Sequence, residues 1–359
     1  MSIGQRFTKV FGVQLPIIQA PMAGSSDAEL AVAVSEAGGL GSLPCAMLSP
    51  DQVRASFHSI RQRTTRPINL NFFCHRSPSP DIVRERQWRE HLAPYYAEFG
   101  IATSSAASTS NRMPFDEEMC DALVALQPVV VSFHFGLPPK TLLARVRATG
   151  ARIMSSATTV EEARWLESAG CDAVIAQGIE AGGHRAMFLA ADAASQVGTL
   201  ALVPQVVDAV KIPVIATGGI GDARGIVAAF ALGASAVQIG TAYLRCPESR
   251  ASALHRKALE AAREDQTVVT NVITGRPARG IVNRVIREVG PISKMVPDFP
   301  RAAEALAPLR SHAENNGSGD FSPLWSGQAA AMCREIPAGT LTKMLAEESV
   351  RLMKQLADL

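Results

Sequence analysis

The segment Val174–Ala186, with the sequence V-I-A-Q-G-I-E-A-G-G-H-R-A, predicts a buried strand that leads into a glycine-rich loop. Apolar residues at its start give way to Gln177, and the pair Gly182-Gly183 stands directly before His184. Glycines let a backbone approach a ligand closely, and an imidazole titrates near neutral pH. The segment therefore indicates a cofactor site beside a group that can move a proton. For this motif taken alone, a simple turn with a solvated histidine is the alternative.

Eight short apolar segments are typical of buried strands, and they are centred near residues 17, 41, 69, 131, 153, 174, 214 and 237. Most are followed by a segment with helical periodicity, such as Pro50–Arg63 or Ala223–Leu232. Strands that alternate with helices form right-handed β-α units around a parallel sheet. Eight such units predict an α/β fold, the (β/α)8 TIM barrel, whose functional residues lie at the carboxyl ends of the strands. A doubly wound open sheet is the alternative fold.

The alternation stops after Thr241, where the sequence predicts a second part of the molecule. We expect residues 1–244 to form the barrel and residues 245–335 to form a mainly helical lobe that covers the substrate side. Apolar residues at helical spacing predict that residues 336–359 form a carboxyl-terminal helix that packs back on the barrel. Residues 76–100 interrupt the alternation earlier and predict a loop and helix over one mouth of the barrel.

Composition indicates a globular protein with a substantial core, because 47% of its 359 residues are hydrophobic and 19% are charged. The net charge is +2 and no Lys/Arg block occurs, so nothing favours nucleic acid or an anionic membrane as a partner. The start of the chain has no apolar signal core, and no apolar run reaches the roughly 20 residues of a membrane-spanning helix. We therefore expect a cytoplasmic protein, with a homodimer as the assembly considered. Six scattered cysteines without a C-x-x-C pair predict reduced thiols.

Three strand ends late in the chain carry glycines and are candidates for binding a phosphate. They are Gln177–Gly183, Thr217–Gly221 and Gln238–Thr241. In a barrel they would be neighbours at one rim, where loops after the last strands often bind phosphate through backbone N–H groups. Such a phosphate would belong to a nucleotide, a flavin or a sugar phosphate. The chain has neither a P-loop nor a Rossmann glycine motif.

Met22, Ala23 and Asn71 follow the first and third predicted strands and should reach the same rim. A soft side chain such as methionine can pack under a planar ring. The amides of Asn71 and Gln177 each donate and accept hydrogen bonds, as the edge of a heterocycle or a phosphate requires. As the alternative, Met22 is a core residue and Asn71 fixes a loop.

Two of the seven histidines, His134 and His184, follow the fourth and sixth predicted strands and can face one cavity. His184 is the candidate base or electrostatic partner, and His134 is expected to shape the substrate site or to pack. No carboxylate stands at metal-ligand spacing from them, so no metal site is predicted. Four histidines in helical or loop segments are expected at the surface: His58, His91, His255 and His312.

Five segments together resemble the nitronate monooxygenase family, formerly called 2-nitropropane dioxygenases. They are P-I-I-Q-A-P-M-A from residue 16, N-L-N-F-F from 69, A-Q-G-I-E-A-G-G-H-R-A from 176, A-T-G-G-I from 216 and V-Q-I-G-T-A-Y from 237. L-W-S-G-Q-A-A at Leu324–Ala330 is similar to the carboxyl-terminal lobe of that family. The combination is specific, although each short piece alone is not.

The resemblance implies an FMN-containing TIM barrel with a second helical domain. Such an enzyme oxidises alkyl nitronates, for example propionate 3-nitronate, with O2 to carbonyl compounds and nitrite, which detoxifies them. By matching motif, Pro21, Met22 and Ala23 would lie against the isoalloxazine ring, and His184 would be the active-site histidine. FMN would be held by Asn71, Gln177, Gly182, Gly183, Gly218, Gly219, Gln238, Ile239, Gly240 and Thr241. Arg185-Ala186 departs from many members, which bears on the substrate range.

An FMN-dependent enoyl-acyl-carrier-protein reductase is the alternative enzyme, because it shares the barrel and an E-A-G-G-H type motif. It would use a reduced nicotinamide and a thioester in place of O2 and a nitronate. The carboxyl-terminal region with L-W-S-G-Q-A-A favours the monooxygenase. A barrel like inosine-monophosphate dehydrogenase is a more distant alternative, because it needs a nucleophilic cysteine on the loop that here carries His184.

Overall fold

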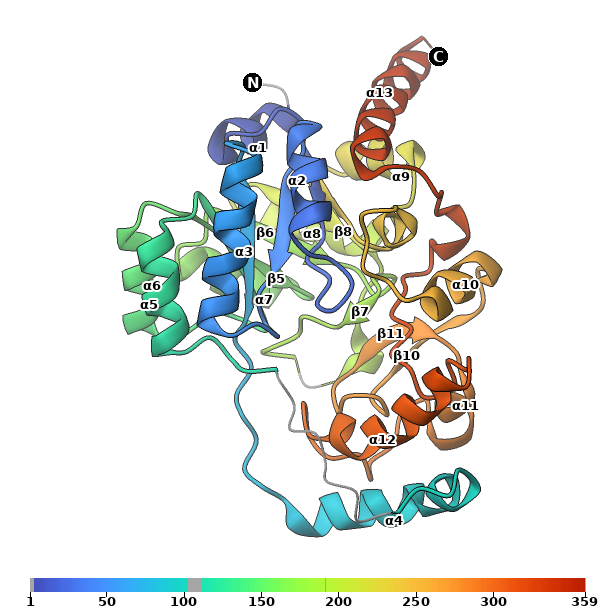
Figure 1. The fold of residues 1–359 in the computed structure, drawn as a ribbon. Helices are drawn as coiled ribbons and strands as arrows, with labels where there is room; N and C mark the ends of the chain where they lie inside the picture. The colour runs from blue at the N-terminus through green and yellow to red at the C-terminus, as the bar shows by residue number, and fades with distance from the viewer. Residues whose placement is uncertain (1–2, 103–111, 191, 359) are drawn as a thin grey trace.

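The computed structural model describes residues 3–102, 112–190 and 192–358, and its centre is a parallel sheet rolled into a barrel (Figure 1). The eight strands are β1 (Ile17–Gln19), β2 (Gly41–Pro44), β3 (Ile68–Phe73), β4 (Val130–His134), β5 (Arg152–Ala157), β6 (Ala173–Gln177), β8 (Val214–Thr217) and β9 (Ala236–Ile239). All eight predicted strands are present. The sheet runs in the order β1-β9-β8-β6-β5-β4-β3-β2. The two ends of this order meet, because the Gln19 N–H donates to the Leu40 carbonyl, just before β2, at 2.9 Å. The TIM barrel is thereby confirmed and the open sheet is wrong.

The barrel interior is closed at the amino ends of its strands by α1 (Ile3–Phe11). Phe7 and Phe11 are fully buried and stack with ring centroids 4.5 Å apart. They pack in one apolar cluster with Ile18 and Ile175, which point inward from β1 and β6. Because this end is filled with side chains, a ligand has room only at the carboxyl ends of the strands.

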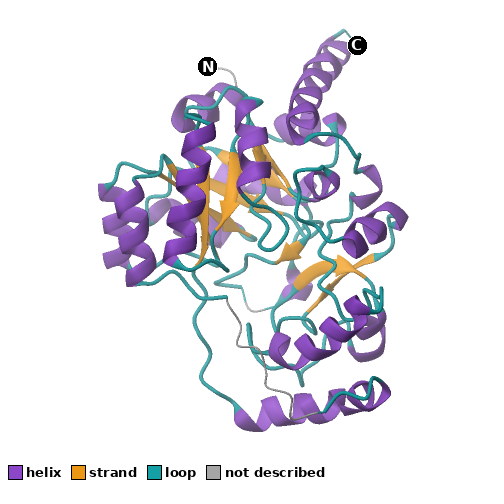
Figure 2. Cartoon of the chain, in the orientation of Figure 1, coloured by secondary structure: helices purple, strands orange, loops and turns teal. Residues whose placement is uncertain are grey.

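Helices surround the barrel on its outer face (Figure 2). They are needed there because the strands of a parallel sheet are apolar on both faces, and the outer face must also be buried. They are α2 (Ala28–Glu36), α3 (Pro50–Arg63), α5 (Glu117–Leu126), α6 (Lys140–Ala148), α7 (Val160–Ser168), α8 (Thr199–Ala209) and α9 (Ala223–Ala231). Local signals set their bounds. In α3, Ser49 and Gln52 form a reciprocal capping box and Pro50 occupies the first helical position.

A second lobe is built mostly from the chain after β9. It contains α10 (Ala253–Ala261), β10 (Thr267–Thr270), β11 (Ala278–Ile281), α11 (Arg284–Val289) and α12 (Ala302–Asn315), with the short 3-10 turns η2 (Thr241–Arg245) and η3 (Ala330–Met332). A third 3-10 turn, η1 (Ala193–Ser195), precedes α8. The lobe contains an antiparallel sheet in the order β10-β11-β7, and β7 (Gly183–His184) comes from the loop after β6.

Helix α4 (Ile82–Glu98) leaves the barrel after β3 and packs on α12. Trp88 and Tyr96 are buried there, and they donate hydrogen bonds to the carbonyls of Ala302 at 3.2 Å and Ala305 at 2.7 Å. Figure 1 shows α4 at the end of the lobe that lies farthest from the barrel. The helix was predicted, but its expected place over the barrel mouth is wrong. The apolar face of α4 packs on α12, more than 200 residues away in the sequence. The spacing of apolar residues within α4 cannot identify this partner.

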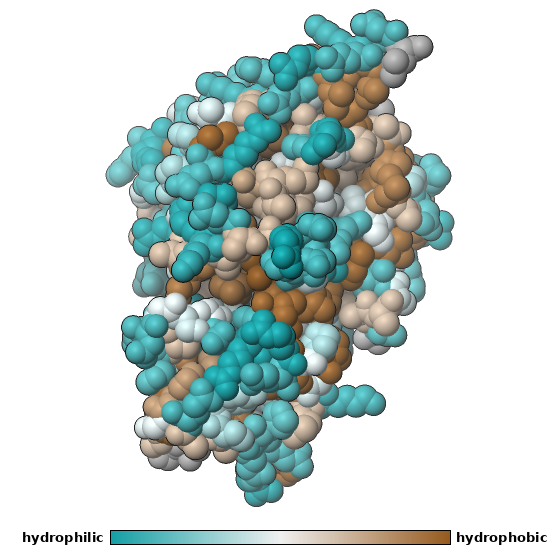
Figure 3. All heavy atoms as spheres, turned by 90° about the vertical axis from the view of Figure 1, so that its right-hand side faces the viewer, coloured by the Kyte–Doolittle hydropathy of each residue, from teal (hydrophilic) through white to brown (hydrophobic). Residues whose placement is uncertain are grey.

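Helix α13 (Ala338–Ala357) packs with its first half on α2 and α9. The Tyr243 hydroxyl and Thr342 Oγ1 lie 2.8 Å apart in this buried contact. The second half of the helix projects from the body, and Leu356 there is 50% exposed. Figure 3 shows hydrophobic atoms on this projecting end and across the middle of the same face. None of the helices in the described part of the chain is long and apolar enough to span a membrane.

Candidate active site

A cavity lies at the carboxyl ends of the barrel strands, where the barrel meets the lobe. Nearly all site residues predicted from the sequence line it: Pro21, Met22, Ala23, Asn71, His134, Gln177, Gly182, Gly183, His184, Gly218, Gly219, Gln238, Gly240 and Thr241. Ile239 is the exception, because its side chain is buried in the cluster between barrel and helices. Only its backbone can therefore face a ligand, and the part of Ile239 in binding FMN stays a prediction.

The loop that carries His184 is fastened to the barrel through one carbonyl oxygen. The Gln177 amide donates to the His184 carbonyl at 3.1 Å, and its own oxygen accepts from the Ala186 N–H at 2.8 Å. His134 Nε2 lies 3.3 Å from the same carbonyl, so this nitrogen donates and carries the hydrogen. Burial, with Arg276 as a second cause, lowers the pKa of His134 to about 3. His134 is thus a neutral positioning residue at the edge of the cavity.

The same loop also belongs to the lobe. His184 pairs with Ala278 in the antiparallel ladder between β7 and β11, and the Arg185 N–H donates to the Pro277 carbonyl at 2.8 Å. Neither contact is visible in the sequence, because nearly a hundred residues separate the partners. The lobe therefore sets the position of the histidine backbone.

Arg185 points away from the cavity and is completely buried. Its guanidinium donates to the carbonyls of Gly178 at 2.6 Å and Gln177 at 2.7 Å, and to the side-chain oxygen of Gln196 at 2.9 Å. Burial lowers its pKa to about 10, which still leaves it charged at neutral pH. Arg185 therefore ties down the end of β6 and does not line the cavity, and its expected bearing on substrate range stays a prediction.

The His184 ring lies among aromatic side chains and one hydroxyl. Its Nε2 is 2.9 Å from Thr274 Oγ1, and its ring centre is 5.1 Å from Phe299 and 5.4 Å from Trp325. Burial holds the pKa of His184 well below its usual range, and Arg112 adds to this effect. The imidazole is accordingly neutral at physiological pH.

Two arginines bring positive charge to one part of the cavity. Arg112 lines it, and the Arg276 guanidinium lies 4.0 Å above the Phe135 ring beside the two site histidines. Phe135 follows His134 with a φ of 70°, a left-handed backbone that bulky residues rarely adopt. Among the described residues, no Asp or Glu lines the cavity. Such a wall favours anionic ligands.

The glycine-rich ends of β6, β8 and β9 meet the lobe segment around Gly327. The Gly327 N–H donates to Thr241 Oγ1 at 2.9 Å, and a Cβ on Gly182 would lie only 2.5 Å from the Gly327 nitrogen. Gly218 and Gly219 adopt positive φ angles of 114° and 70°. Glycine is required at these points because the backbones are in contact or left-handed. The predicted phosphate-binding ends are thus brought together at one rim.

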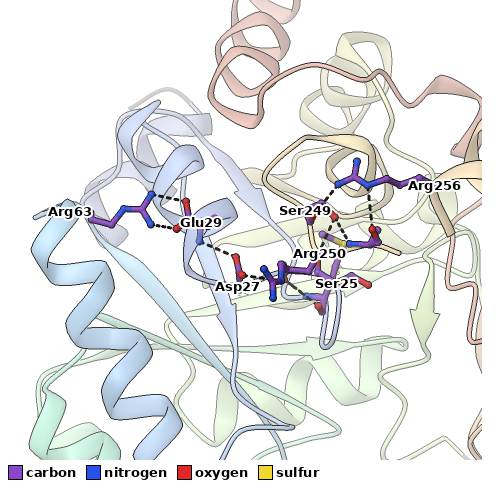
Figure 4. Close-up of polar contacts among 10 residues, drawn as sticks. Ser25, Asp27, Glu29, Arg63, Ser249, Arg250 and Arg256 are labelled. Carbon is purple, nitrogen blue, oxygen red and sulfur yellow. Dashed lines mark hydrogen bonds and ion pairs between the residues drawn. The ribbon is translucent and has the colours of Figure 1, made fainter. Parts of the chain in front are cut away.

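The loop after β1, which carries Pro21 to Ala23, is held by the segment before α10 (Figure 4). The Ser25 carbonyl accepts from the Arg250 N–H at 2.9 Å and from Ser249 Oγ at 3.1 Å. The Arg250 side chain lies 3.4 Å from the Asp27 carboxylate. This network fixes the loop that was predicted to lie against a planar ring.

One buried polar atom of the cavity wall fits a bound flavin. Gln238 Oε1 is buried at the cavity and has no hydrogen-bond partner among the described residues. An unpaired buried acceptor is unfavourable, so this atom requires a donor from a ligand. The imide and ribityl groups of FMN supply such donors.

Several site residues could not be found from the sequence. His255 was expected at the surface, but it is only 6% exposed, lines the cavity, and its Nε2 lies 3.0 Å from the Trp325 carbonyl. That expectation is wrong, because its helix α10 packs beneath the segment at 324–330. His58 and His91 are exposed, as predicted. No local sequence pattern marks Arg112 or Thr274 as a site residue. Trp325 was indicated only by the resemblance of L-W-S-G-Q-A-A to the family.

The glycine-lined strand ends and the unpaired buried oxygen of Gln238 suit a flavin, and the neutral buried His184 stands beside them, so the site fits the class of flavin-dependent oxidoreductases. The family model described as "Nitronate monooxygenase" matches residues 5–348, and the chain belongs to this family.

Individual relatives agree with this assignment over nearly the whole chain. A nitronate monooxygenase of Pseudomonas aeruginosa is 45% identical over 346 residues, which cover 96% of this chain and 98% of that protein. The structure of a nitroalkane oxidase from Streptomyces ansochromogenes matches with a TM-score of 0.87 and 39% identity, over 98% and 99% of the two chains. FabK from Thermotoga maritima matches with a TM-score of 0.74 and 29% identity, over 98% of both chains. The chain is thus less similar to FabK than to the first two proteins.

Proposed function

We propose that this protein oxidises alkyl nitronates with O2 to carbonyl compounds and nitrite, with FMN bound in the cavity. The observation that carries this proposal is the wall around His184, which presents Arg112 and no carboxylate among the described residues. A nitronate is an anion, and such a wall attracts it without a competing negative charge. Membership of the family supports the same reaction.

Two groups of described residues would bind different parts of FMN. Gly218, Gly219, Gly240 and Thr241 would hold its phosphate through backbone N–H groups and a hydroxyl. The loop of Pro21 to Ala23 would carry the ring, and Gln238 Oε1 would accept a hydrogen bond. Bound FMN supplies the passage of electrons between the nitronate and O2.

The remaining residues bind and orient the substrate. Arg112 draws the anion inward, and the His184 ring presents one nitrogen to the cavity. Phe73 and Trp325 line the same wall and exclude water from the reacting carbon. Gln177 and His134 keep the His184 carbonyl in place, so the ring needs little rearrangement when substrate arrives.

The decisive experiment measures oxygen consumption by the purified flavoprotein after addition of propionate 3-nitronate, without NADH or NADPH. We expect rapid uptake with release of nitrite, and FMN as the cofactor released on denaturation. Absence of uptake by a flavin-loaded protein would contradict the proposal. Oxidation of NADPH with an enoyl thioester would then favour the enoyl-reductase alternative. A cytoplasmic location and a homodimer stay predictions, and size-exclusion chromatography tests the second.

A further inference from the structure

We propose that Thr274 positions His184 as a hydrogen-bond donor toward the cavity and thereby selects ionised nitronates over neutral nitroalkanes. This inference rests on the proposed function and narrows its substrate class. Both substrate types occur in the names of similar proteins, a nitronate monooxygenase and a nitroalkane oxidase. Oxidation of a nitronate and oxidation of a neutral nitroalkane make different demands on His184, and they depend on which ring nitrogen carries the hydrogen.

Thr274 belongs to the lobe and is almost completely buried, with 1% of its surface exposed. Its Oγ1 lies 2.9 Å from His184 Nε2. The lobe also pairs with the backbone of His184 through Ala278. Ring and backbone of the histidine are therefore held by the same lobe, and the residue lines the cavity.

The position of the proton follows from the single hydrogen of the hydroxyl. Among the described residues, His184 Nε2 is the one hydrogen-bond partner of Thr274 Oγ1. If the imidazole donated to this oxygen, the buried hydroxyl hydrogen would have no acceptor, which is unfavourable. The hydroxyl therefore donates to Nε2. A neutral imidazole with an acceptor at Nε2 carries its hydrogen on Nδ1.

The charged and titratable groups that face the ring keep it neutral. They are Arg112, His134, Arg276 and His75. The two arginines disfavour a positive charge on His184, the neutral rings of His134 and His75 supply no negative charge, and the described residues place no carboxylate against the ring. These surroundings disfavour a second proton, which would turn the ring into a cation.

The consequence for chemistry is asymmetric. An Nδ1–H group donates a hydrogen bond to the oxygen of an ionised nitronate. It cannot accept the carbon-bound proton of a neutral nitroalkane, because that step needs a free lone pair on the nitrogen. The opposite tautomer would make His184 a base and would favour nitroalkanes.

The activity test compares ethyl nitronate, formed beforehand, with freshly dissolved neutral nitroethane in oxygen-consumption assays. We expect wild-type kcat/KM to favour the nitronate at least 100-fold. Thr274→Val keeps the side-chain shape but loses the hydroxyl, so nitronate kcat/KM should fall at least tenfold while FMN content is unchanged. Thr274→Ser should restore it to within about threefold. The matched control is Thr270→Val in the same lobe, since the Thr270 hydroxyl donates to the Pro291 carbonyl and strand β11 lies between Thr270 and His184.

A second readout follows the tautomer directly. Nitrogen-15 NMR of histidine-labelled enzyme should show His184, assigned by its loss in His184→Ala, in the Nδ1–H form, and Thr274→Val should change that signal. An Nε2–H signal in the wild type, or equal turnover of both substrates, would overturn the inference. If the wild type oxidises neither substrate, the proposed function fails. The NMR spectrum still decides whether Thr274 sets the tautomer.

Discussion

His184 of β7 is paired in antiparallel register with Ala278 of β11, although ninety-four residues separate them in the sequence. The pairing makes the candidate catalytic loop the third strand of the lobe's sheet. Displacement of the lobe would therefore move the histidine relative to the barrel strands that carry the other site residues. Barrel and lobe together form the site, and neither contains it alone.

Replacement of His184 by alanine should leave flavin binding intact and remove most turnover. The ring contacts Thr274 and aromatic side chains, whereas the backbone of the loop is held separately by Gln177 and Ala278. We expect a loss of 10²-fold or more in kcat/KM for nitronates, the order found for positioned catalytic groups. Absorbance of bound flavin and oxygen uptake measure the two effects. Normal turnover by this variant would show that the catalytic assignment is wrong.

Replacement of Arg185 by methionine should destabilise the protein without first altering substrate preference. It leaves the buried carbonyls of Gln177 and Gly178 without their donors. We expect a decrease of roughly 2–5 kcal/mol in the free energy of unfolding, since several buried acceptors lose partners. Urea unfolding measures it. Arg224→Met is the matched control, because that arginine is exposed and should change stability by under about 1 kcal/mol.

Replacement of Gln238 by leucine should separate cofactor binding from folding. The apoprotein should be as stable as the wild type or slightly more stable, because a buried unpaired Oε1 is removed. FMN should bind about tenfold more weakly, which corresponds to the loss of one hydrogen bond of about 1.4 kcal/mol. Thermal unfolding of apoprotein and fluorescence titration with FMN give the two values. Unchanged FMN affinity would mean that Gln238 does not contact the cofactor.

The apoprotein should lose stability as the pH falls below 6.5, and His75 should contribute to this loss. Burial, with Arg276 as a second cause, lowers the pKa of His75 to about 4, whereas its ordinary value is 6.5. The unfolded chain therefore binds the proton first. The stabilising contribution of neutral His75 is complete above pH 6.5 and declines toward pH 4, by up to about 1.4 kcal/mol per pH unit.

A His75→Phe variant tests this assignment. The ring packs against Phe299, with centroids 4.8 Å apart, so phenylalanine retains the contact without a titrating group. Urea unfolding at pH 7, 6 and 5 should then give a shallower decline than in the wild type. An equal slope in both proteins would exclude His75 as a source of the acid sensitivity. His58→Phe serves as control, because His58 is exposed.

The alternation of apolar strands and amphipathic helices could be read from the sequence, because both patterns repeat within a few residues. All eight barrel strands and the helix Pro50–Arg63 appear where periodicity predicted them. The glycine-bearing strand ends were found for a related reason. In a closed parallel barrel, successive carboxyl ends must meet at one rim.

Contacts between distant segments were decided only by the tertiary structure. The placement of α4 on α12, the burial of His255 and the direction of Arg185 depend on partners that no local pattern identifies. Thr274 stands ninety residues from His184, yet one hydrogen bond joins them. By itself, the sequence determined the barrel and the residues at its rim, because local periodicity and chain order impose them. Only the tertiary structure decided which lobe residues surround the histidine and form a hydrogen bond with its ring, because burial and hydrogen bonding at the site involve both parts of the chain.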